Sequence, residues 1–308
     1  MKTKKLFFII FLLFFIPCLI FSFEYENKES SYTLNFLSKK YFPVKNIENM
    51  EITTTYEIIQ FSTTFSKDLI IDIYGNNNTI IPEINIKNKT LCIETTASYT
   101  NPGDICNIII YLPEKISFKN ISILSENKNE KEFLIPDISA ENIIIEKVTA
   151  DIRGKSISGN LILKTVTGDI ELNNITSNQI YLSSKKGNIN IKSFEGEYVS
   201  IKTSNKITAD DITCDFFDIK SEYGNISLAL NKAPESSSYL KSDRGQLQLF
   251  IPKDESFDLS VYSSRGFFFD KKMKKRSSPR HEYTISYHKG GPVIHVATKS
   301  GNIELYDF

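Results

Sequence analysis

The side chains that could perform acid–base or metal chemistry are few in this sequence. The three histidines are His281, His288 and His295, and none has the HExxH or CxxC spacing that gathers metal ligands. His281 and His288 flank the stretch 282–287, and their odd separation puts them on opposite faces of a strand. The phrases GxSxG and GxxxxGK[S/T] are absent. We therefore expect strand and turn histidines, with neither a metal site nor a cofactor.

Two carboxylates support the most specific enzymatic hypothesis, a β-helix that cleaves carbohydrate. Asp151 and Asp169 occupy the same place in a repeat, and a β-helix that cleaves carbohydrate needs carboxylates gathered on one outer face. The following units carry Asn188, Lys206 and Asn225 at that place. A column that drifts between these residue types is typical of turns, where such side chains bond to nearby backbone. We therefore expect a protein that is not an enzyme, with a carbohydrate-active β-helix as the third hypothesis.

A sequence motif that repeats about every 19 residues predicts the strands and turns that position these residues. It reads KTVTGDIEL at 164–172, KSEYGNISL at 220–228 and TKSGNIEL at 298–305. A Ser or Thr precedes the bend in each unit, and glycine suits the bend because it adopts left-handed conformations; asparagine is the next best residue. The predicted turn positions are Gly168, Gly187, Asn205, Gly224, Gly245, Gly266 and Gly301.

Short alternating apolar runs flank each bend, such as LIL at 161–163 and NINI at 188–191. Period-two alternation predicts short strands with one buried face, and a unit of this length has no room for a crossover helix. One unit cannot bury its own apolar face, but stacked copies can. The sequence therefore predicts an all-β fold, a parallel β-helix or β-solenoid with coils of about 19 residues.

The chain divides into three segments. Residues 1–22 hold three lysines and then an apolar run, which predicts a signal peptide cleaved near Ser22; an uncleaved anchor and lipidation at Cys18 are the alternatives. Residues 23–135 predict a less regular β region that supplies the cap and early coils. Residues 136–308 predict the repeat solenoid, closed by a hairpin about Gly290-Gly291-Pro292 and a final strand pair. We expect no transmembrane span in the mature chain.

Export would permit disulfides. Cys92 and Cys106 are symmetric about Tyr99, beside the turn signal Asn101-Pro102-Gly103-Asp104, so a hairpin there would place them opposite each other. A disulfide is one prediction, and two small buried thiols are the alternative. Cys214 shares a repeat column with small residues, which indicates a packing role.

Charge limits the classes of partner. Lys+Arg and Asp+Glu both number 37, and this balance provides no general attraction to nucleic acid, so no nucleic-acid partner is expected. One local exception is an outward column formed by Lys164, Lys202, Lys220 and Lys241, with Ser183 interrupting it. The column is a candidate stripe for anionic glycans or other polyanions, and the alternative is a set of lysines that keeps a long β surface soluble.

The repeated K-T/S-x-x-G-N/D-I-x-L units, the segment IIIYLPEK at 108–115 and the closing VIHVATKSGNIELYDF resemble the bacterial putative-adhesin β-strand-repeat family, a domain of unknown function in the style of head-domain adhesins. The resemblance covers roughly residues 45–308. It implies an exported, extended β-solenoid with a surface role, and it transfers no catalytic residues. Asn205, Ala150 and the basic stretch 271–281 depart from the pattern.

The leading hypothesis is therefore an exported, non-catalytic interaction protein of the cell envelope or surface, an adhesin that presents a stacked face to an unidentified protein or glycan ligand. The runner-up is a periplasmic scaffold or sensor module that binds an envelope partner. Periplasm, cell surface and extracellular space all remain open as locations.

Overall fold

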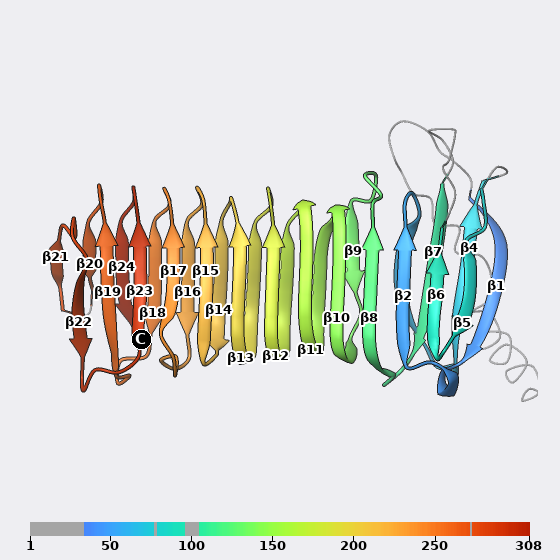
Figure 1. Ribbon diagram of the computed structural model, residues 1–308, viewed down its shortest axis with the longest axis horizontal. Coiled ribbons are helices and arrows are strands. Elements are labelled where there is room, and N and C mark those ends of the chain that lie inside the picture. Colours follow the sequence, from blue (N-terminus) through green and yellow to red (C-terminus); the bar gives the residue numbers. More distant parts are fainter. Residues whose placement is uncertain (1–33, 77–78, 96–104, 272) are drawn as a thin grey trace, which may run out of the picture.

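The protein is a rod of stacked β-strands, shown in the computed structural model of Figure 1. The structure describes residues 34–76, 79–95, 105–271 and 273–308. These ranges contain strands and a single 3-10 turn, η1 (Val44–Asn46), so the expected all-β class is confirmed. Within the same ranges, no helix has the length and apolar character needed to span a membrane. The predicted signal peptide, residues 1–22, lies outside the described residues.

Each coil of the rod contributes one strand segment to each of two faces. In the central coils a single long strand crosses from one face to the other, as in β11 (Asp151–Thr167), β12 (Ile170–Ser184) and β13 (Ile189–Thr203). The crossing is a bend at one residue with positive φ, at Asn174 (58°) and Ser193 (67°), for example. Polar residues with short side chains tolerate this left-handed conformation better than branched ones do, which explains why the bends carry Asn, Ser and Asp.

We call the face that carries the lysine column the lysine face. Its strands are parallel except at the two outer edges, and each lies beside the next in space. The spatial order is β5 (Glu83–Lys87), β6 (Thr90–Glu94), β2 (Asn49–Thr54), β8 (Ser117–Ser125), β10 (Ile138–Thr149), the second halves of β11, β12 and β13, β15 (Phe216–Ser221), β17 (Ser238–Ser242), β23 (Val293–Thr298), β19 (Phe257–Ser263) and β22 (Tyr283–Tyr287).

The opposite face is built in the same way, and the two faces enclose the core. Its spatial order is β1 (Asn35–Pro43), β4 (Asp68–Gly75), β7 (Cys106–Pro113), β3 (Ile58–Thr64), β9 (Glu132–Ile135), the first halves of β11, β12 and β13, β14 (Ile207–Thr213), β16 (Ile226–Leu230), β18 (Leu247–Ile251), β24 (Ile303–Asp307), β20 (Phe268–Asp270) and β21 (Lys275–Ser277).

Columns of aliphatic side chains fill the space between the faces. Ile152 pairs with Ile170, Ile170 with Ile189, and Ile189 with Ile207, so equivalent residues of successive coils lie directly above one another. All four are buried. Inward isoleucines remove apolar surface from water at every coil, and this burial is the main force that holds the stack together.

The N-terminal end contains a coil out of sequence order. The coil made by β2 and β3 lies between the coil of β6 and β7 and the coil of β8 and β9, although it precedes both in the chain. The antiparallel strands β5 and β4 lie outside these coils and cover the end of the stack, with β1 beyond β4.

The C-terminal end contains a second inserted coil, and it corrects one expectation. The coil of β23 and β24 lies between the coil of β17 and β18 and the coil of β19 and β20, as Figure 1 shows. The predicted closing hairpin about Gly290-Gly291-Pro292 is therefore wrong, because β22 and β23 pair with opposite edges of β19 and not with each other. The far end is covered by antiparallel β21 and β22, and the last strands of the chain lie inside the stack.

The predicted disulfide also needs correction. Cys92 lies in β6 on the lysine face and Cys106 lies in β7 on the opposite face, and the structure does not join them in a disulfide. The hairpin that would have placed them together does not form, since β6 pairs with β2 and β5 while β7 pairs with β3 and β4. Both cysteines are buried, as the alternative had it.

Candidate functional site

The repeated Ser/Thr-x-x-Gly phrase forms the corner at which each coil turns from the lysine face to the opposite face. The Ser184 hydroxyl donates to the carbonyl of Gly168 one coil earlier (2.8 Å) and accepts from the amide of Gly187 in its own turn (2.8 Å). Ser221 and Ser242 repeat both bonds. The hydroxyl column therefore ties each turn to the preceding coil and satisfies backbone groups that would otherwise be buried without partners.

Glycine is required at this corner because successive turns lie in direct contact. A Cβ on Gly187 would lie 1.7 Å from the Gly168 carbonyl oxygen, which no side chain could tolerate without displacing a coil. Asn205 occupies the same column in a shorter turn: its amide bonds to the hydroxyl of Thr203, two residues earlier, instead of three as at Gly187. Its side-chain amide then caps the Lys186 carbonyl of the coil before (2.6 Å).

The carboxylate column is also structural. The Asp151 carboxylate accepts from the backbone amide of Asp169 (2.9 Å), and the Asp169 carboxylate accepts from the amide of Asn188 (2.6 Å). The amide oxygen of Asn188 repeats the contact with Lys206, and that of Asn225 repeats it with Gln246. These side chains link one coil to the next, which accounts for the mixture of Asp and Asn in the column.

The lysine column lies on one face, just before the glycine corner. Lys202 pairs with Lys220 and Lys220 with Lys241 in adjacent parallel strands. Lys164 is separated from them by Ser183 and forms an ion pair with Glu146 (2.7 Å). Stacked coils lie about 4.8 Å apart, so the three lysines leave the face at neighbouring positions, and the middle one, Lys220, forms an ion pair with Asp218 (2.8 Å).

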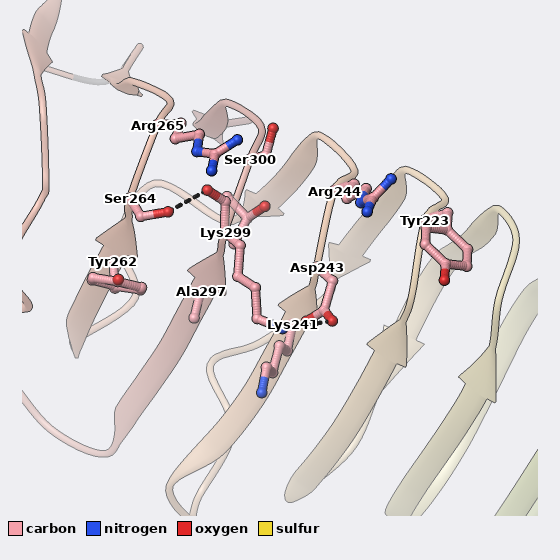
Figure 2. A pocket seen from close by; sticks show the side chains of 11 residues that line it. Tyr223, Lys241, Asp243, Arg244, Tyr262, Ser264, Arg265, Ala297, Lys299 and Ser300 are labelled. Carbon is pink, nitrogen blue, oxygen red and sulfur yellow. Dashed lines mark hydrogen bonds and ion pairs between the residues drawn. The ribbon is translucent and has the colours of Figure 1, made fainter.

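Beyond Lys241 the column opens into a hollow at the corner, with a volume of about 710 Å³. Figure 2 shows Tyr262 and Tyr223 at its two ends and Ala297 between charged side chains from neighbouring coils. A smaller hollow continues it along the lysine column, and the two share Lys241 and Asp243. We call the combined surface the basic groove and define it by Lys202, Lys220, Lys241, Arg244, Arg265 and Lys299.

The basic groove has an excess of positive charge. The acids among its lining residues are Glu222 and Asp243, and Asp243 forms an ion pair with Lys299 (2.8 Å). A hydrogen bond from Lys299, together with the nearby charges of Lys241 and Arg244, lowers the pKa of Asp243 below its ordinary value. Within the described part of the chain, Lys202, Lys241, Arg244 and Arg265 form no ion pair. These four charges are available to an anionic ligand.

An aromatic ladder runs beside the lysine column on the same face, and sequence reasoning missed it. The Tyr198 ring stacks on Phe216 at 5.1 Å between centroids with a 6° interplanar angle, and Tyr239 stacks on His295 at 4.9 Å and 8°. A tilted contact adds Tyr181 to Tyr198, and an edge-to-face contact joins Phe216 to Tyr239. The available signal was an aromatic residue at an outward position before the bend of several successive units.

The orientation of these rings limits what they can bind. In the two stacked pairs each ring covers one face of its neighbour, and the contacts with Tyr181 and between Phe216 and Tyr239 further reduce the ring faces left for a ligand. Ring edges carry partial positive charge, whereas ring faces carry negative charge. The ladder is therefore poorly suited to stacking a neutral sugar over a ring face, and it adds to the cationic character of the adjacent lysine column.

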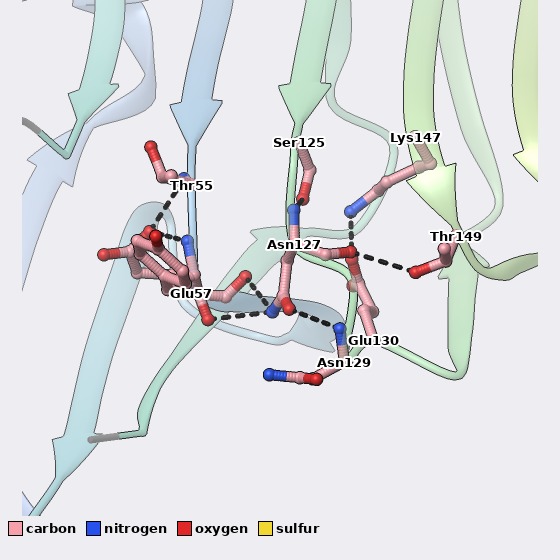
Figure 3. Close-up of polar contacts among 9 residues, drawn as sticks. Thr55, Glu57, Ser125, Asn127, Asn129, Glu130, Lys147 and Thr149 are labelled. Carbon is pink, nitrogen blue, oxygen red and sulfur yellow. Dashed lines mark hydrogen bonds and ion pairs between the residues drawn. The ribbon is translucent and has the colours of Figure 1, made fainter. Parts of the chain in front are cut away.

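A second polar cluster lies inside the rod, where the less regular N-terminal coils meet the repeats (Figure 3). Lys147 occupies the hydroxyl column, between Ser125 and Thr165, and forms a salt bridge with Glu130 at 2.7 Å in which both side chains are 1% exposed. Asn127 donates to the carbonyls of Tyr56 (2.8 Å) and Glu57 (3.1 Å).

Burial dominates the ionisation of this pair. It raises the pKa of Glu130 and lowers the pKa of Lys147, because the salt bridge does not fully replace the lost hydration. The cluster is enclosed, so we regard it as a structural contact and not as a binding site.

The other candidate residues are dispersed. His295 belongs to the aromatic ladder, with its Nδ1 3.5 Å from Glu282, while His288 contacts the carbonyl of Lys253. Cys214 is buried, and burial raises the pKa of its thiol to about 12, as suits a packing role. Among the described residues, no group of three or more His, Cys, Asp or Glu side chains could hold a metal ion.

Solved structures that the chain matches include a putative adhesin from Bacteroides fragilis NCTC 9343 (15% identity, covering 88% of this chain and 97% of that chain, TM-score 0.44). A putative adhesin from Parabacteroides distasonis ATCC 8503 is similar as well (10% identity, 87% and 96% covered, TM-score 0.45). No curated protein matches the chain. Residues 47–306 match the family described as Toastrack DUF4097, which confirms the resemblance seen in the glycine phrase, and the chain belongs to this family.

Proposed function

We propose that this protein is an exported, non-catalytic binding protein that presents its lysine face to an anionic partner at the cell envelope or surface. The observation that carries the proposal is the basic groove. Four of its cations have no acidic partner within the described residues, and they lie along one corner of an otherwise charge-balanced chain. Cations arranged in this way attract an anionic ligand and fix its direction along the rod.

A soluble-surface role alone explains the groove less well. Lysines that serve solubility need no common alignment, and surfaces usually mix both signs of charge. Here Lys202, Lys220 and Lys241 are stacked in register at neighbouring positions, next to a hollow that collects three further cations. An anionic partner would balance this local excess of positive charge.

The export part of the proposal rests on the signal peptide predicted at residues 1–22, and the adhesive role is the one named for the solved structures described above. The alternative function, a periplasmic scaffold, differs from the surface role in its cellular location. Protease treatment of intact and lysed cells that carry a tagged chain tests this: cleavage on intact cells is expected, and cleavage only after lysis would contradict the surface role.

Binding is tested separately with a generic polyanion. The purified chain should bind immobilised heparin in biolayer interferometry, and the affinity should fall as salt rises, since salt screens exposed charges. The triple variant Lys202→Glu, Lys220→Glu, Lys241→Glu should lose about 10-fold in affinity.

A matched control carries the same change of net charge outside the groove, at Lys155 and Lys192 on the opposite face and at Lys206 in the corner just before β14, and should stay within about 2-fold of the parent. Equal losses in both triples would show that net charge alone drives binding, and the groove would then have no specific role.

A further inference from the structure

We infer that the basic groove takes a linear acidic polysaccharide that lies parallel to the rod axis, with a carboxylate on each sugar residue. This inference rests on the proposed function and names its class of ligand. Three observations carry it: the spacing of the lysines, the place where the column opens into the hollow, and the orientation of the aromatic rings.

The spacing of charge comes first. Lys202, Lys220 and Lys241 belong to successive coils, so their Cα positions repeat at about 4.8 Å along the axis. A pyranose residue in an extended glycan advances by a similar length, but successive carboxylates point in different directions about the chain, so the lysines of neighbouring coils would meet them through their flexible four-carbon stems. The ion pair between Lys220 and Asp218 (2.8 Å) restrains the middle ammonium group, which limits the entropy lost when a ligand orders it.

An acidic peptide fits this spacing poorly. The side chains on one side of an extended peptide repeat every two residues, at about 6.7 Å, so they fall out of step with the coils after the first contact. Single-stranded nucleic acid binds by stacking its bases on aromatic faces. In the pairs of Tyr198 with Phe216 and of Tyr239 with His295, each ring already covers one face of its partner, which leaves fewer ring faces for a base.

The hollow gives the groove a distinct end. Past Lys241 the same column carries Ala297 and then Tyr262, so the positive charge moves to the corner, where Lys299, Arg244 and Arg265 supply it. The small side chain of Ala297 leaves room above the strand. Arginine binds carboxylates through two parallel N–H donors, so a carboxylated sugar is well matched to this end of the groove.

The aromatic ladder supplies the neighbouring contacts. Tyr239 lies one outward position from Lys241 on β17, and it is 44% exposed. Its hydroxyl can both donate and accept a hydrogen bond, as sugar hydroxyls do, while the ring edge carries partial positive charge. A polyuronate offers alternating hydroxyl and carboxylate groups, which suits a face made of tyrosines beside lysines.

The length of the groove predicts the length of the ligand. The groove extends over the five coils that contain β13, β15, β17, β23 and β19, a distance of about 19 Å between the first and the last. Affinity should therefore rise with oligomer length up to on the order of five sugar residues and then level off.

Isothermal titration calorimetry with α-1,4-linked oligogalacturonates of graded length tests the inference. The parent chain should bind oligomers that reach across the groove about 10-fold more tightly than the disaccharide. The fully methyl-esterified oligomer has the same backbone without charge and should bind at least about 10-fold more weakly. The triple variant at Lys202, Lys220 and Lys241 should lose binding by a similar factor, whereas the control triple at Lys155, Lys192 and Lys206 should not.

Other outcomes would overturn the inference. If the methyl-esterified oligomer binds as well as the acid, or if oligomer length has no effect on affinity, the groove does not recognise a row of carboxylates. If inorganic polyphosphate of matched charge binds more tightly through the same lysines, the class of ligand is wrong although the anion-binding function stands. If neither polyanion nor heparin binding depends on the groove, both the inference and the proposed function fail.

Discussion

The glycine corner of the repeats and the same corner at the N-terminal junction hold neighbouring coils together with different chemistry. In the repeats, a hydroxyl such as that of Ser221 accepts from one backbone amide and donates to one carbonyl, and glycine lets the turns touch. At the junction, Lys147 takes the place of the hydroxyl, and its charge is matched by Glu130 from a loop.

The two kinds of corner differ in whether they distinguish one alignment of neighbouring coils from another. Hydroxyl corners are alike, so they stabilise the stack without distinguishing one register from the next. A buried ion pair costs desolvation and adds little net stability, but a misplaced coil would leave a charge buried without a partner. We interpret Lys147 and Glu130 as the contact that fixes where the repeats begin relative to the N-terminal coils.

The largest expected effect is at the hydroxyl corner itself. Gly187→Ala would place a Cβ 1.7 Å from the Gly168 carbonyl oxygen, so adjacent coils would have to separate. We expect a loss of about 3 kcal/mol or more in the free energy of unfolding, measured by urea denaturation followed by circular dichroism. A loss below about 1 kcal/mol would show that adjacent corners can move apart at little cost in free energy. The hydroxyl corners and the junction would then differ less than the structure indicates.

The second effect is at the junction. Lys147→Met leaves Glu130 buried and unpaired, and it should lower the free energy of unfolding by about 3 kcal/mol. The double variant Lys147→Thr, Glu130→Gln restores the column's hydroxyl and should recover most of that loss. If the double variant is no more stable than the single one, the cost comes from packing and not from charge.

This variant also has a signature in pH. Burial raises the pKa of Glu130 above its ordinary value of 4.5, so the folded state binds this proton more tightly than the unfolded state does. The resulting stability is full below pH 4.5 and is lost as the pH rises through the folded-state pKa. The deficit of Lys147→Met relative to the parent should therefore shrink as the pH falls toward 4.5, and a deficit independent of pH would argue against an ionised Glu130.

A smaller effect tests one hydroxyl. Ser221→Ala removes the bonds to the Asn205 carbonyl (2.7 Å) and from the Gly224 amide (2.9 Å), and it should cost about 1–2 kcal/mol. Ser227→Ala, on the outward side of β16, is the matched control and should change stability by less than about 0.5 kcal/mol. Similar losses of stability in both variants would show that the hydroxyl column does not stabilise the corner.

The smallest effect concerns the shortened turn. Asn205→Gly loses the bond to the Lys186 carbonyl and adds freedom to the unfolded chain, so we expect a loss of about 1 kcal/mol in the thermal unfolding of the purified protein. A gain in stability would mean that glycine is preferred even where the turn is one residue shorter.

The repeats could be predicted from the sequence because their signal is local. The glycine spacing and the alternation beside it place Lys202 opposite Lys220 and Ser184 opposite Thr203, and the structure has both pairings. The candidate site was visible in part: the lysine column follows from the same register, while the hollow requires side chains from four coils.

The errors arise where pairing depends on distant residues. Nothing within 283–298 distinguishes a hairpin from two strands that flank a third, since both leave the same alternation. The cysteine prediction failed in the same way, because symmetry about a turn signal does not fix which sheet each strand enters. No local pattern marks Lys147 as buried, and its burial depends on Glu130, which lies in a loop.

The inserted coil at the C-terminus also has a consequence for the order of events during folding. Coils in the middle of the rod can form one after another as the chain emerges, but the coil of β19 and β20 cannot settle on its final neighbour until the last residues arrive. A chain that ends before Val293 would not be a shorter rod. It would have a gap one coil wide between the coil of β17 and β18 and the coil of β19 and β20, and the β23–β24 segment of another copy could pair with both edges.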